Sequence, residues 1–200
     1  FAFFINVLGP ITPYLKSELD LTYTVGSLHY TAFALGILLV GLVGHAVIRR
    51  LGRWRSLWLG ALGMTLGVYL LLAGRSPVIT VGACLLMGSV GSLVLVIVPS
   101  ALTDRHGAHS TQALSEANLS ASLVAITAPL LVGWFAPLPG GWRLALGLVA
   151  LAPALLWLGL SKARPAEVEA QSAARERTRL PLPGWFWVYW VALVLGVAAE

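Results

Sequence analysis

The residues of this chain that could do chemistry are a few ionisable side chains placed within long apolar stretches. Glu200 follows the aromatic residues that end at Trp190, His29 follows Asp20, and Glu116 lies beyond a polar connector. An ionisable group is costly in an apolar environment, so each could exchange a proton or hold a cation. The alternatives are a structural hydrogen bond for Glu200, a packing role for His29 and a charge at a helix end for Glu116.

Neutral polar residues form a second group of candidates. Asn6, Gln112 and Asn118 also lie within or beside apolar stretches, where amide groups either line a cavity or join neighbouring helices. We treat all three as candidate cavity-lining residues.

One cluster has the side-chain types of a metal site but lies in a solvated loop. Asp104, His106 and His109 lie close together in a polar connector. Three such residues in a solvated loop commonly occur by accident, and Cys84 is the single cysteine. We therefore expect no metal, no disulfide and no cofactor.

The elements that must position these residues are recognised by the spacing of charge. Only 10% of the residues are charged and 58% are hydrophobic. Five stretches of about 18 to 28 residues contain no Asp, Glu, Lys or Arg, and that is the length a helix needs to cross about 30 Å of hydrocarbon. These stretches lie between Asp20 and Arg49, Arg55 and Arg75, Arg75 and Asp104, Glu116 and Arg143, and Arg143 and Lys162.

The predicted fold is an all-α polytopic membrane protein with six transmembrane helices and a partial seventh. We expect a six-helix bundle over 1–161 with a truncated first helix, a cytoplasmic linker over 162–184 and the start of the seventh helix over 185–200, so that the chain is a fragment. The predicted helices cover about 1–15, 22–48, 55–73, 77–103, 111–135, 142–161 and 185–200. The best candidates for close helix contact are Gly63 and Gly67.

The basic residues predict the orientation in the membrane. Lys16, Arg75 and Arg143 are the only ones in connectors on one side, and the connectors on the other side hold the remaining ten. The positive-inside rule makes the second side cytoplasmic, which puts the N-terminus inside. Because these residues lie in connectors rather than on one folded face, we expect no nucleic-acid partner. The composition favours a bacterial inner membrane.

Six helices, a long basic connector and a new helix resemble the first half, and the start of the second half, of a major facilitator superfamily transporter. The connector Lys16-Ser17-Glu18-Leu19-Asp20-Leu21-Thr22, followed by Val25-Gly26, resembles the link between helices 1 and 2 of that family. Gly141-Trp142-Arg143 resembles its opening of helix 6. The resemblance implies that the six helices form two inverted three-helix repeats.

The segment between the second and third predicted helices partly matches a motif of that family. In the segment from His45 to Arg55, Gly52, Arg50 and Arg53 match, whereas His45 stands at the first glycine and Arg49 at the acidic position. The resemblance implies a gating role for Arg49, Arg50, Gly52 and Arg53, with the acidic latch lost or moved. The alternative is that the arginines only enforce orientation.

The fifth predicted helix carries part of a second motif. Pro129 and Gly133 resemble the proline-glycine motif of the proton-coupled exporters in the family, although Val124, Ala128 and Val132 stand where that motif has glycine. The fourth helix lacks the buried arginine that many of those exporters carry. The resemblance therefore favours export only slightly over uptake.

The resemblance implies a secondary active transporter that moves a small organic solute by alternating access, with proton coupling. The expected partners are the solute, membrane lipid and protons, and we expect a monomer that is not an enzyme. Three alternatives remain open. They are an uptake permease of the same fold, an integral-membrane enzyme using Asp104, His106 and His109, and a channel.

Overall fold

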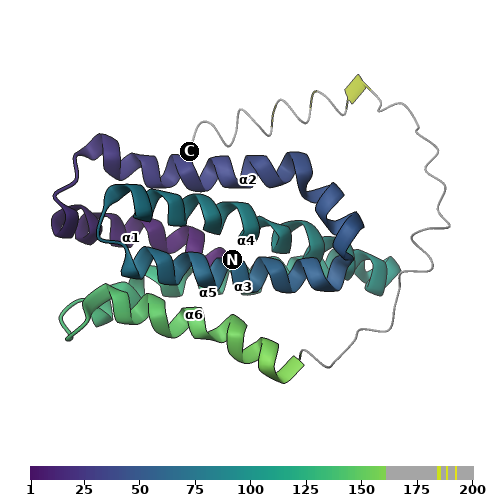
Figure 1. Ribbon diagram of the computed structural model, residues 1–200. Helices are drawn as coiled ribbons and strands as arrows, with labels where there is room; N and C mark the ends of the chain where they lie inside the picture. The colour runs from purple at the N-terminus through teal and green to yellow at the C-terminus, as the bar shows by residue number, and fades with distance from the viewer. Residues whose placement is uncertain (161–183, 186–187, 189–191, 193–200) are drawn as a thin grey trace. The chain divides into compact units, whose positions relative to one another are not determined.

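The computed structural model describes residues 1–160 together with Gly184, Trp185, Val188 and Ala192. Each element of the described residues is helical (Figure 1). The chain divides into two compact units, Phe1–Pro165 and Ala166–Glu200. The helices of the first unit are α1 (Ala2–Leu19), α2 (Tyr23–Leu51), α3 (Arg53–Ala73), α4 (Pro77–His106), the short η1 (Gly107–His109), α5 (Ser110–Phe135) and α6 (Gly141–Leu160).

Local chemistry explains where several helices begin and end. Asp20 ends α1 in the left-handed conformation with φ 53°, and the Thr22 hydroxyl accepts a hydrogen bond from Val25 N–H at the start of α2. Pro77 begins α4, where its missing N–H costs nothing. Gly52 alone joins α2 to α3, with φ 80° and ψ 157°, a conformation that essentially only glycine adopts.

Glycines bring α4 into close contact with α2 and α3. A Cβ added to Gly88 would lie 2.1 Å from the Phe33 carbonyl oxygen of α2. On α3, a Cβ added to Gly63 would lie 2.4 Å from a methyl carbon of Val90, and one added to Gly67 would lie 2.5 Å from Met87. The helices therefore approach more closely than larger residues would allow, and the contact role predicted for Gly63 and Gly67 is confirmed.

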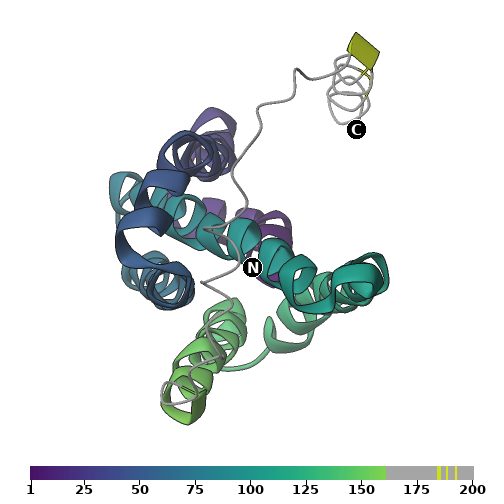
Figure 2. The same ribbon diagram turned by 90° about the vertical axis from the view of Figure 1, so that its right-hand side faces the viewer.

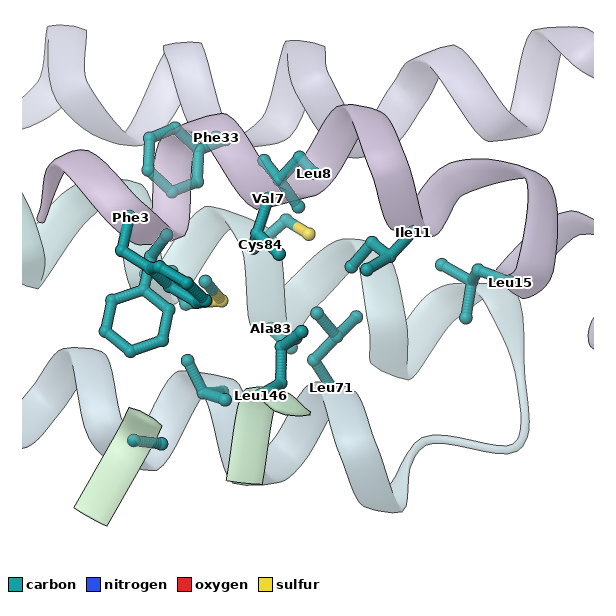
Figure 3. Close-up of a cluster of buried hydrophobic side chains, with 14 of the residues drawn as sticks. Phe3, Val7, Leu8, Ile11, Leu15, Phe33, Leu71, Ala83, Cys84 and Leu146 are labelled. Carbon is teal, nitrogen blue, oxygen red and sulfur yellow. The ribbon is translucent and has the colours of Figure 1, made fainter. Parts of the chain in front are cut away.

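The larger of two buried apolar clusters receives side chains from all six helices. The buried face of α1 supplies six residues, and it meets Phe33 from α2, Leu71 from α3, Cys84 from α4 and Leu146 from α6 (Figure 3). Ala128 and Val132 add α5 to the same core. Figure 2 shows α6 on the side of the bundle away from α2, where it packs against α3 and α5. The core thus holds α1 between α2 and α5.

Within the described residues, four stretches are long and apolar enough to cross a membrane. They are Tyr23–Leu51, Arg53–Ala73, Pro77–Phe135 and Gly141–Leu160, and the third contains both α4 and α5. The described part of the chain therefore has the all-helical architecture of a membrane protein, as predicted. The bounds of α1 to α6 also fall within a few residues of the predicted ones. Of the predicted helix over 185–200, Trp185, Val188 and Ala192 are described and are helical, and the rest lies outside the described residues.

Candidate functional site

One exposed stripe of α1 is made of small or polar residues. Asn6, Gly9, Pro13 and Ser17 are all exposed, and their spacing of three and four residues puts them on one stripe of the helix. The Asn6 amide donates only to the Ala2 carbonyl, one turn earlier in the same helix. Asn6 therefore makes no side-chain hydrogen bond to another helix among the described residues, whereas Pro13 and Ser17 border α2.

The neighbouring α5 carries a similar stripe. Thr111, Ser115, Asn118 and Ser122 are exposed and recur at i, i+4, i+7 and i+11. Because α1 and α5 pack against each other, the bundle has two polar stripes on adjoining helices. We call these two stripes together the polar wall.

Other exposed surfaces of the bundle are covered by leucine. On α6, the exposed residues include Leu144, Leu148, Leu151 and Leu155. On α2 they include Leu35, Leu38, Leu39 and Leu42. Apolar surface suits contact with lipid, whereas polar groups at membrane depth face protein or a water-filled cavity. The bundle therefore has apolar surface that suits contact with lipid and, elsewhere, stripes that suit polar contacts.

The structure divides the sequence-predicted residues of α5 between two faces. Asn118 belongs to the polar wall. Glu116 accepts a hydrogen bond of 2.9 Å from the Gln112 amide, and both share a second exposed stripe with Leu119 and Leu123. Glu116 and Gln112 are thus placed at the polar end of an otherwise apolar stripe.

His29 is buried between α2 and α4. Its Nδ1 lies 3.0 Å from the Val25 carbonyl oxygen, and its Nε2 lies 2.8 Å from the Thr80 hydroxyl. A carbonyl can only accept a hydrogen bond, so Nδ1 is the donor to Val25. His29 therefore joins two helices through both ring nitrogens.

The predicted motif residues lie at the end of the bundle where α2 ends, α3 begins and α4 ends, which we call the arginine end. Arg53 pairs with Asp104 on α4 through a hydrogen-bonded ion pair. Arg49 and Arg50 are exposed in the last turn of α2, and Gly52 forms the turn. The sequence did not predict that Asp104 pairs with Arg53, because the two residues lie on different helices. The only signal in the sequence was that Asp104 is acidic.

Another network, also missed from the sequence, lies at the opposite end of the bundle. Glu18 of α1 accepts a 2.8 Å hydrogen bond from the indole N–H of Trp142 and forms an ion pair with Arg143. Trp142 and Arg143 both lie on α6. Arg143 also donates to the Leu72 carbonyl of α3. The network therefore ties together the ends of α1, α3 and α6.

An open cavity of about 710 Å³ lies beside this end, between α1 and α2. Its lining includes Thr12, Ser17 and Tyr30, and also Lys16, whose ammonium group lies 3.0 Å from the ring centroid of Tyr23. That contact is a cation–π interaction, so the cation of the cavity already has a partner.

The remaining predicted residues do not join these groups. Pro129 and Gly133 are exposed on α5, and a Cβ added to Gly133 would meet nothing within 4 Å. Glu200 lies outside the described residues. Among the described residues, no group of three His, Cys, Asp or Glu side chains could hold a metal ion.

The family model for the Major Facilitator Superfamily matches residues 1–199. The search of curated proteins found no match.

Proposed function

Because the chain belongs to the major facilitator superfamily of membrane transporters, we propose that it forms part of a secondary active transporter for a small organic solute. The solute would pass along the polar wall and be exposed to each side of the membrane in turn, by alternating access. The proposal extends to proton coupling and to export rather than uptake.

The observation that carries this proposal is the polar wall. Its amides and hydroxyls, above all those of Asn6 and Asn118, can donate and accept hydrogen bonds along a path beside the core. In lipid those groups would be costly, whereas a second helical bundle or a water-filled path would satisfy them. Transport of a solute would explain why these polar groups are exposed, whereas a purely structural role of the bundle would not.

The helix contacts support an arrangement of six membrane helices as two inverted three-helix repeats. If α1 to α3 and α4 to α6 are equivalent, exchanging the repeats converts the contact of α2 with α4 into a contact of α5 with α1. Both contacts are extensive in the structure. We further propose a seventh helix that begins near Trp185, a cytoplasmic N-terminus, a bacterial inner membrane and a monomeric state.

Proton coupling would use an ionisable group close to the solute path. Glu200 is the candidate that sequence reasoning favours, and the proposal assigns it the exchange of a proton during each cycle. Of the other two candidates, His29 would have to give up its bond to Thr80, and Glu116 shares a stripe with leucines. These placements support Glu200 as the first residue to test.

Cysteine labelling tests the polar wall. Cys84 is fully buried, so the unaltered protein gives a low background. In membranes, Asn118→Cys should react with a charged thiosulfonate reagent, because water reaches the wall. Leu123→Cys is the matched control: it lies on the same helix, little more than one turn away, but on the leucine stripe, and should not react. Equal labelling of both, or labelling of Leu123→Cys alone, would contradict the proposal.

A further inference from the structure

The arginine end carries more positive charge than its own carboxylates neutralise. Arg49, Arg50, Arg55 and Arg105 are exposed, and no ion pair is found for any of them within the described residues. The carboxylate of this end, Asp104, is already paired with Arg53. Four guanidinium groups are therefore left facing the surroundings.

Three helix ends gather these arginines on one surface. Gly52 is the whole connection between α2 and α3, so Arg49 and Arg50 stay close to Arg55. The ion pair of Arg53 with Asp104 holds the last turn of α4, and with it Arg105, beside the first turn of α3. Figure 1 shows these helix ends together at its right-hand side. The charges thus form one patch.

The start of α3 adds to this positive field. No side chain caps its N-terminus, and its first turn contains no acidic residue. The free N–H groups and the positive end of the helix dipole favour an anion, and phosphate binds readily in such positions. Placing Arg53 and Arg55 there is unfavourable for the helix alone, because cations stabilise the other end. A bound anion would offset that cost.

Two tryptophans place this patch at the level of lipid headgroups. Trp54 and Trp58 lie one turn apart on α3 and meet edge to face, with ring centroids 5.5 Å apart. Tryptophan is enriched at the boundary between headgroups and acyl chains. The Trp58 indole N–H is buried without an acceptor in the part of the chain that the structure describes. The nearest abundant anion at this level is a phospholipid.

We propose that the arginine end is a binding site for the headgroup phosphate of an anionic phospholipid. Arg49, Arg50, Arg55 and Arg105 would surround the phosphate, which the start of α3 would also attract. At the opposite end of the bundle, Arg143 is paired with Glu18 and Lys16 lies over Tyr23, which leaves Arg75 as the one exposed arginine there without an ion pair among the described residues. The charge surplus is therefore a property of one end and not of the whole bundle.

Lipid binding can be measured by native mass spectrometry of the full-length protein with phosphatidylglycerol and with phosphatidylcholine of the same acyl chains. The wild type should prefer phosphatidylglycerol by roughly 25-fold or more. Each surface arginine contributes about five-fold, so Arg49→Gln combined with Arg50→Gln should weaken binding roughly 25-fold. Arg75→Gln, an exposed arginine at the opposite end, should bind like the wild type.

Several outcomes would overturn the proposal. They are unchanged phosphatidylglycerol binding by the double variant, an equal loss in Arg75→Gln, and displacement of the lipid by soluble glycerophosphate at millimolar concentration, which would indicate a site for free phosphate. If the double variant does not fold, the lipid preference of the wild type is measured at increasing salt concentration instead. The preference should then fall steeply with salt, and a constant preference refutes the site.

Discussion

The contact of Gly88 on α4 with the backbone of α2 gives the sharpest test of the packing. In Gly88→Ala, the new methyl group would lie 2.1 Å from the Phe33 carbonyl oxygen, whereas ordinary contacts begin at 3.4 Å. The obstacle is backbone, so no rotamer change can relieve it. The helices α2 and α4 would have to move apart by more than 1 Å.

The expected magnitude follows from two opposing effects. Overpacking a core costs roughly 1 to 3 kcal/mol, and a clash with backbone belongs at or above the upper end. Alanine recovers about 1 kcal/mol of helix propensity relative to glycine. A net loss of at least about 2 kcal/mol should lower the melting temperature by roughly 4 to 8 °C in a protein of this size.

The assay is thermal unfolding of the full-length protein in detergent, with Gly82→Ala as the matched control. Gly82 lies on the same helix, and a Cβ added there meets nothing within 4 Å. The control should melt at the wild-type temperature or slightly above it. A Gly88→Ala variant that melts like Gly82→Ala would show that α2 and α4 do not pack as described.

Two further predictions concern the hydrogen bonds between helices. Thr80→Val should destabilise the protein by about 1 to 3 kcal/mol, because it leaves Nε2 of buried His29 unpaired. Thr80→Ser should restore stability in the same melting assay. A valine variant as stable as the wild type would show that the hydrogen bond is absent. Glu18→Gln should cost less than about 1 kcal/mol, since its side chain is 40% exposed and its pair with Arg143 is screened, and the difference from wild type should shrink at high salt. A loss of several kcal/mol that ignores salt would contradict that view of the pair.

The positions of the helices could be predicted from the sequence because a membrane span requires a long stretch without charge. The stretch between Arg55 and Arg75 is an example: it predicted a helix over 55–73, and α3 covers Arg53–Ala73. Gly63 and Gly67 could also be identified as contact residues, since small residues four apart form one stripe of a helix. Local spacing carries this kind of information.

The partners of individual residues could not be predicted in the same way. Glu18 meets Trp142 and Arg143 only because α1 and α6 end side by side, and Arg53 meets Asp104 for the corresponding reason at the arginine end. Such pairs depend on how helices distant in sequence pack. The polar stripe containing Ser115 and Asn118 was missed from the sequence, and only the structure shows that its residues are exposed on a helix that packs against α1.

Solute flux driven by a proton gradient tests the central proposal most directly. Vesicles containing the full-length protein should accumulate or extrude a solute from a panel of labelled organic compounds while the gradient lasts, and Glu200→Gln should abolish gradient-driven movement but spare exchange. Flux that ignores the gradient would remove proton coupling, and unchanged accumulation by Glu200→Gln would remove that residue. If no compound of the panel crosses faster than in protein-free vesicles, the account of this chain as part of a solute transporter is contradicted.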